Sequence, residues 1–131
     1  MNNMIMTEDE MKKVVKSADF LNDKGYAREI GESTISFLGE EINFIISFER
    51  YSNVSDIIIK FIKENEIYSV GWIACVRSGL SIEPHQRLEN VLMLLSYIRE
   101  NYSSIISRDY CKASDKLIKE FIENERRSKK V

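Results

Sequence analysis

The sequence predicts a single α+β domain with an N-terminal helix, an antiparallel sheet of about five strands in meander order, and two C-terminal helices packed on one face of that sheet. Two patterns carry this prediction. Residues 41 to 77 are dominated by β-branched and aromatic residues in alternating runs, which is typical of strands. Residues 85 to 122 place apolar residues three and four apart, which is typical of helices. The length of 131 residues fits one domain.

A capping box marks the start of the N-terminal helix. Thr7 and Glu10 have the Thr-x-x-Glu spacing in which each side chain accepts a hydrogen bond from the other residue's backbone N–H. Gly25 is expected just past the end of this helix. The apolar residues at helical spacing between these points are Met11, Val14, Val15, Ala18 and Leu21.

Five strands are expected after this helix, each separated from the next by a short polar turn. The last of them is apolar on both faces and is therefore placed at the centre of the sheet. Within it, Gly71 beside Trp72 indicates a bulge or a close backbone approach, and Trp72 is expected in the core. The predicted strands cover residues 26–30, 34–38, 42–49, 57–62 and 68–76.

Two helices are expected after residue 77. An apolar stripe predicts the first from about His85 to Asn101, with Pro84 in its first turn. The second begins near Asp109 and places apolar residues on one side. Residues 126–131 are mostly basic and are expected to form a frayed tail of the single domain, which spans residues 1–131.

No motif for catalysis or metal binding is recognisable. His85 is the only histidine and has no evident partner, so we interpret it as a solvated residue. Glu40 and Glu41 are adjacent and would point to opposite sides of a strand, which excludes a shared carboxylate site. Cys75 and Cys111 match no metal or redox spacing and are expected to be reduced and structural. The sequence thus predicts a protein that is not an enzyme, with no catalytic residue, no metal and no cofactor.

The charge distribution indicates the kind of partner. The formal net charge of −2 argues against nucleic-acid binding. Between Glu29 and Glu66 there are eight acidic and three basic residues, a net of −5, and an acidic surface would attract a basic protein. No signal peptide is recognisable and no apolar run approaches the ~20 residues of a membrane span, so we expect a cytoplasmic protein without membrane contact.

A set of short segments carries a resemblance to a known family. These segments are Val70-Gly71-Trp72-Ile73, Val76-Arg77, Arg87-Leu88-Glu89-Asn90-Val91, Leu94-Leu95-Ser96-Tyr97-Ile98, Asn101-Tyr102 and Tyr110-Cys111. They are similar to segments of small bacterial immunity proteins that accompany polymorphic toxins, including those of contact-dependent growth inhibition systems, and the resemblance covers roughly residues 35 to 122. It implies a cytosolic, non-enzymatic protein that binds one cognate toxin domain tightly and neutralises it, and such toxins are often nucleases with basic clefts.

The function hypothesis is therefore an immunity protein that binds a toxin, expected to be a basic nuclease, through acidic and aromatic residues of the sheet edge and loops. The first alternative is an adaptor or regulatory module that binds another host protein. The second alternative is a small enzyme with an acidic pocket. No small-molecule substrate is expected. The residues expected to contact the partner are Glu49, Tyr51, Asp56, Glu64, Glu66 and Glu83.

Overall fold

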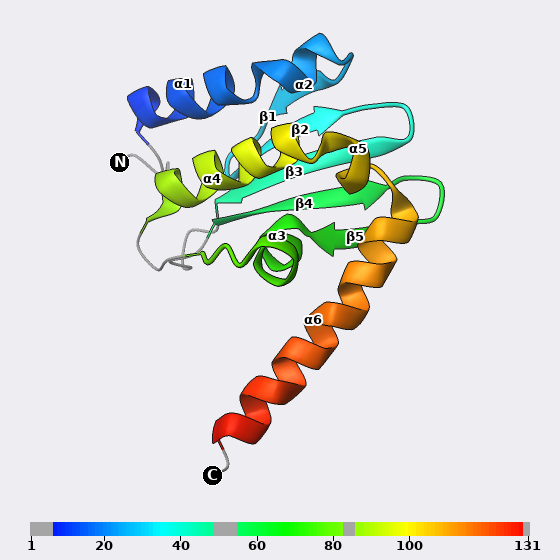
Figure 1. Ribbon diagram of the computed structural model, residues 1–131. Helices are drawn as coiled ribbons and strands as arrows, with labels where there is room; N and C mark the ends of the chain where they lie inside the picture. Colours follow the sequence, from blue (N-terminus) through cyan, green and yellow to red (C-terminus); the bar gives the residue numbers. More distant parts are fainter. Residues whose placement is uncertain (1–6, 49–54, 83–85, 130–131) are drawn as a thin grey trace.

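A five-stranded antiparallel sheet in the order β1-β2-β3-β4-β5 forms the centre of the molecule (Figure 1). We describe it from a computed structural model that covers residues 7–48, 55–82 and 86–129. The predicted fold class is confirmed, including the meander order of the sheet. The strands are β1 (Ala27–Ile30), β2 (Thr34–Leu38), β3 (Ile42–Phe48), β4 (Ser55–Phe61) and β5 (Glu66–Ser69).

The alternation of residues along the strands gives the sheet one buried face. Phe44 lies opposite Ile59, and Ile46 lies opposite Ile57, and all four side chains are fully buried. Successive strand residues point to opposite faces, so Asp56 and Ile58 lie on the other face of β4, where side chains are only half-buried. The sheet is thus a platform with its core on one side.

Helices cover the buried face. α1 (Glu8–Ser17) packs against α4 (Arg87–Glu100), and α4 packs against β4. Figure 1 shows both helices over the same side of the sheet. The short helices α2 (Asp19–Asp23) and α5 (Tyr102–Ile105) follow α1 and α4. The fully buried residues of these helices, and of the turn between α1 and α2, that complete the core are Val14, Ala18, Leu21, Val91, Leu94, Ile98 and Ile105.

The predicted signals at the ends of the first helical region are confirmed. The N–H of Glu10 donates to Thr7 Oγ1 at 3.2 Å, and the N–H of Thr7 donates to Glu10 Oε1 at 2.9 Å. After α2 the chain turns at Gly25, which has a φ of 98°. Few residues other than glycine adopt this left-handed conformation without strain, so the sequence alone located this turn.

The prediction of a strand over residues 68–76 is wrong beyond Ser69. β5 ends there and lies at an edge of the sheet, so its expected central position is wrong, and Val70–Ser78 form helix α3. The N–H of Trp72 donates to Ser69 Oγ at 3.1 Å, which caps the helix at its start, and Gly79 ends it in the left-handed conformation with a φ of 69°. Val70, Ile73 and Ala74 are buried, whereas Trp72 is 41% exposed, so its expected place in the core is also wrong.

The last helix, α6 (Arg108–Lys129), packs against α3 and extends away from the sheet (Figure 1). Arg77 of α3 donates from Nε to Ser114 Oγ at 2.9 Å, and its guanidinium lies 4.4 Å from the centre of the Tyr110 ring. These contacts fix α6 along α3. Residues 126–129 of the expected tail are helical. None of the helices in the described ranges has the length and apolar character needed to cross a membrane.

Candidate functional site

The most apolar of the cavities described here lies where β4, the start of α3 and the middle of α6 meet. Its volume is about 400 Å³. One carboxylate, Asp56, reaches it from β4, and most of the remaining lining is apolar or aromatic. The hydrogen bond from Arg77 to Ser114 joins α3 and α6, the two helices that form walls of this cavity. The lining residues are Asp56, Ser69, Gly71, Trp72, Cys75, Ser81, Ile82 and Phe121.

The Asp56 carboxylate accepts three hydrogen bonds from neutral donors. Its Oδ1 accepts from the N–H of Ile57 at 2.8 Å and from the N–H of Gly71 at 2.9 Å. Its Oδ2 accepts from the Ser69 hydroxyl at 2.6 Å. Burial raises the pKa of the Asp56 carboxyl, and the three hydrogen bonds only partly offset that effect. Asp56 therefore anchors the first turn of α3 to β4 through a desolvated carboxylate.

Gly71 allows this close approach between α3 and β4. A Cβ atom at this position would lie 2.7 Å from Asp56 Oδ1 and 2.5 Å from Ile82 Cδ1. Both distances are shorter than a van der Waals contact, so a side chain at residue 71 would displace the carboxylate or the wall of the cavity. The predicted close backbone approach at Gly71 is confirmed, although it occurs at the start of a helix and not in a strand.

Two half-exposed aromatic rings border the cavity. Trp72 of α3 and Phe121 of α6 are 41% and 39% exposed, and their ring centres lie 6.0 Å apart in an edge-to-face arrangement. Leaving two large apolar rings in contact with water is unfavourable, and tryptophan is among the residues enriched where proteins bind one another. The ring pair therefore marks a candidate contact surface.

The two cysteines differ in their surroundings. Cys75 is half-buried and lines the cavity, whereas Cys111 is fully buried and its thiol donates to the carbonyl of Ile105 at 3.3 Å. Burial raises the pKa of the Cys111 thiol to about 12, which makes it unreactive at neutral pH. Both cysteines are free, as expected.

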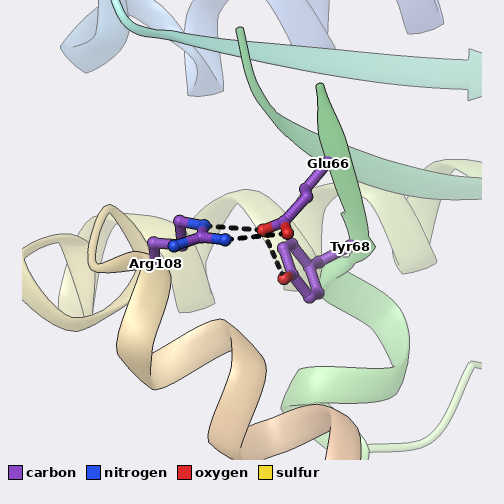
Figure 2. Close-up of polar contacts among 3 residues, drawn as sticks. All are labelled: Glu66, Tyr68 and Arg108. Carbon is purple, nitrogen blue, oxygen red and sulfur yellow. Dashed lines mark hydrogen bonds and ion pairs between the residues drawn. The ribbon is translucent and has the colours of Figure 1, made fainter. Parts of the chain in front are cut away.

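Glu66, another predicted contact residue, is held within the molecule (Figure 2). Arg108 donates from Nε to Glu66 Oε1 at 2.7 Å and from a terminal nitrogen to Oε2 at 2.9 Å, and the Tyr68 hydroxyl donates to Oε1 at 2.9 Å. Hydrogen bonding to Arg108, with a smaller contribution from Tyr68, lowers the pKa of Glu66 to about 2. This pair joins β5 to the first residue of α6.

The predicted contact residues do not form one cluster in the described structure. Asp56 lies at the start of β4 and Glu66 at the start of the antiparallel strand β5, so they occupy opposite ends of the sheet. They also point to opposite faces, because Asp56 lies on the same side as Ser69 whereas Glu66 lies opposite the buried Phe61. Glu64 is exposed in the turn between β4 and β5. Glu49, Tyr51 and Glu83 lie outside the described residues, as do Pro84 and His85.

A second cavity, of about 390 Å³, lies between the end of α2, the turn after β2 and α5. The hydroxyls of Tyr26 and Tyr102 form a hydrogen bond of 2.9 Å at this site, and Lys24 Nζ lies 4.2 Å from the centre of the Tyr102 ring. Burial raises the pKa of the Tyr26 hydroxyl. The hydrogen bond and the cation–ring contact tie the end of α2 to α5.

In the cavity beside Asp56, the hydroxyl that contacts the carboxylate is already hydrogen-bonded. The Ser69 hydroxyl donates to Asp56 and accepts from Trp72, so both of its polar functions are engaged. In the part of the chain that the structure describes, no three His, Cys, Asp or Glu side chains gather as metal ligands would. The sequence analysis named Asp56 as a candidate site residue but not Phe121 or Ile82. In the sequence these two residues look like ordinary apolar positions, and they come together at the cavity only when α3 and α6 pack against each other.

Comparison of the chain with protein-family models, curated proteins and solved structures finds no match.

Proposed function

We propose that this protein is an immunity protein that neutralises a toxin domain by direct contact, with the cavity between α3 and α6 as the centre of its binding surface. The observation that carries the proposal is the exposed pair Trp72 and Phe121 beside a cavity of about 400 Å³. Aromatic side chains at the rim of a pocket supply most of the binding energy in many protein interfaces. The resemblance to immunity proteins supplies the class of partner.

The charge of the site supports a basic partner. Among the described residues that line the cavity, Asp56 alone is charged at neutral pH. A toxin domain with a basic surface would complement this carboxylate and would be attracted by the exposed acids of the sheet turns, such as Glu64. The partner is therefore expected to bury the ring pair and to place positive charge at the cavity.

The proposal is tested by producing the toxin domain encoded beside this gene, with and without the protein, in the same cells. We expect the wild-type protein to restore growth and to form a one-to-one complex by isothermal titration calorimetry. Trp72→Ala and Phe121→Ala should each raise Kd by about tenfold or more, which corresponds to at least ~1.4 kcal/mol of binding free energy.

Ile30→Ala is the matched control. Ile30 is 56% exposed on β1, the sheet edge opposite β5, so its truncation removes a similar exposed apolar side chain far from the cavity. Absence of a complex between the two wild-type proteins in moderate salt would refute the immunity function. A complex that tolerates Trp72→Ala and Phe121→Ala as well as it tolerates Ile30→Ala would refute this choice of binding surface.

A further inference from the structure

We propose that the cavity between α3 and α6 receives an arginine side chain of the partner protein, with Asp56 as its counter-ion and with Trp72 and Phe121 contacting the guanidinium group. The inference rests on the proposed function, because it names the chemical group by which the partner is recognised. It is carried by the hydrogen bonding of Asp56, by the lack of a cation beside it in the described ranges, and by the aromatic rim.

The hydrogen bonding of Asp56 leaves one acceptor position open. A carboxylate offers about four lone-pair positions on its two oxygens. Oδ1 uses both of its positions on the N–H groups of Ile57 and Gly71, whereas Oδ2 accepts, among the described residues, from the Ser69 hydroxyl alone. Because Asp56 lines the cavity, a donor that enters the cavity can reach the remaining position on Oδ2.

The charge of Asp56 is not balanced by a cation among the described residues. The ion pairs formed in those ranges are Arg108 with Glu66, Lys119 with Asp115 and Arg127 with Glu123, and no lysine or arginine lines the cavity. Burying a carboxylate without a counter-ion is unfavourable, even when neutral groups donate hydrogen bonds to it. A cation that occupies the cavity would offset this cost.

The walls of the cavity favour arginine over lysine. A guanidinium group is planar and weakly hydrated, and it stacks on aromatic rings while it donates to a carboxylate. Trp72 and Phe121 border the cavity, and Ile82 supplies an apolar wall for the methylene groups of the side chain. An ammonium group would lose more hydration on entering and would gain less from the rings.

The first experiment measures binding of a small arginine probe to the full chain. N-acetyl-arginine methylamide is titrated against the protein while two signals are followed: the fluorescence of Trp72, which is the only tryptophan of the chain, and the amide resonance of Gly71. The matched probe is the citrulline analogue, which has nearly the same shape without the charge. We expect the arginine probe to bind about tenfold more tightly, because a hydrogen bond to a charged group is stronger than a neutral one.

The variant Asp56→Asn should abolish the difference between the two probes, because an amide keeps the shape of the side chain and removes the charge. If this variant does not fold, Phe121→Ala provides the test, since Phe121 is half-exposed and its loss should still weaken the arginine probe. Equal affinity of the two probes for the wild-type protein would overturn the inference. So would an arginine preference that both variants retain.

Cys75 allows an independent measurement inside the cavity. A cationic and an anionic methanethiosulfonate reagent are compared, and mass spectrometry separates labelling at Cys75 from labelling at the buried Cys111. Relative to a short unstructured cysteine peptide, Cys75 should favour the cationic reagent by about tenfold, because the Asp56 carboxylate attracts a positive charge into a poorly solvated space. A ratio equal to that of the peptide would contradict the inference.

These measurements separate the inference from the proposed function. If the toxin complex forms but the wild-type protein does not distinguish the two probes, the arginine site is wrong and the immunity function stands. If the arginine probe binds through Asp56 but no complex with the toxin forms, the site exists and the proposed function is wrong. Both sets of measurements use the full chain.

Discussion

Asp56 and Glu66 are carboxylates on the adjacent strands β4 and β5, and each binds the first turn of a helix, yet their surroundings are opposite. Glu66 forms a bidentate ion pair with Arg108 at the start of α6, and the Tyr68 hydroxyl donates a further hydrogen bond to the Glu66 carboxylate. Among the residues that the structure describes, Asp56 meets only neutral donors, those of Ile57, Ser69 and Gly71 at the start of α3. Within this part of the chain, the same chemical group is therefore balanced at one end of the sheet and left without a counter-ion at the other.

The contrast separates a structural carboxylate from a candidate binding carboxylate. Arg108 satisfies Glu66 with matched charge, so a partner protein would have to break an existing ion pair to use it. Asp56 lies in a cavity with aromatic walls, and it can accept a further donor without losing any of its present hydrogen bonds. Acidic residues that look equivalent in the sequence thus have different capacities for binding.

The largest effect is expected from Asp56→Ala. This change leaves the N–H groups of Ile57 and Gly71 and the hydroxyl of Ser69 without their acceptor, and should lower the free energy of unfolding by about 2–4 kcal/mol. Asp56→Asn keeps an acceptor in place and should change the free energy of unfolding by less than ~1 kcal/mol. Urea denaturation followed by circular dichroism measures both. Equal losses in the two variants would show that the hydrogen bonds do not stabilise α3.

Gly71→Ala should lower the free energy of unfolding by about 1–3 kcal/mol, although alanine is the better helix former. The added Cβ would meet the Asp56 carboxylate and Ile82 at distances that require one of them to move. In an Asp56→Ala background the same change should cost less, because the carboxylate is gone, and the coupling in a double-mutant cycle should exceed ~0.5 kcal/mol. If the effects of the two substitutions on the free energy of unfolding simply add, the cost of Gly71→Ala does not come from contact with the Asp56 carboxylate.

The two carboxylates should affect acid stability with opposite signs. The folded pKa of Glu66 is lowered to about 2, so its contribution is present above its unfolded pKa of about 4.5 and is lost as the pH falls from there towards 2. The folded pKa of Asp56 is raised, so its contribution is present below its unfolded pKa of about 3.8 and is lost as the pH rises through the folded pKa.

Thermal denaturation between pH 2 and pH 6 tests these signs. Glu66→Gln should flatten the loss of stability in acid, whereas Asp56→Asn should make that loss steeper, because it removes a contribution that grows as the pH falls. Curves that shift in the same direction for both variants would contradict the difference in surroundings that we describe.

The smallest effect is expected for Glu66→Gln on binding of the arginine probe. Glu66 lies on the opposite face and at the opposite end of the sheet from Asp56, so its charge should alter the affinity of the probe by less than about twofold in physiological salt. The same titration of Trp72 fluorescence measures it. A larger change would indicate that the probe binds outside the cavity.

Local sequence patterns were sufficient for most of the fold. Three patterns depend only on residues that are close in the chain, so they can be recognised before the fold is known. They are the capping box at Thr7 and Glu10, the alternation along β2, β3 and β4, and the apolar stripe of α4. The helix boundaries at Ser69 and Gly79 were not predicted, because the apolar, partly β-branched run between them favoured a strand.

Only the tertiary structure showed that residues 70–78 form a helix and where the candidate site lies. Two contacts hold the start of α3: Ser69 accepts from the N–H of Trp72, and Asp56, fifteen residues before Gly71, accepts from the N–H of Gly71. No local pattern encodes the second contact. The cavity likewise requires Phe121 of α6 to reach Trp72 of α3. By itself the sequence determined which segments are apolar, charged or capped, because these properties belong to neighbouring residues. Which carboxylate is balanced and which is left facing a cavity depends on groups far apart in the chain, so packing alone settles it.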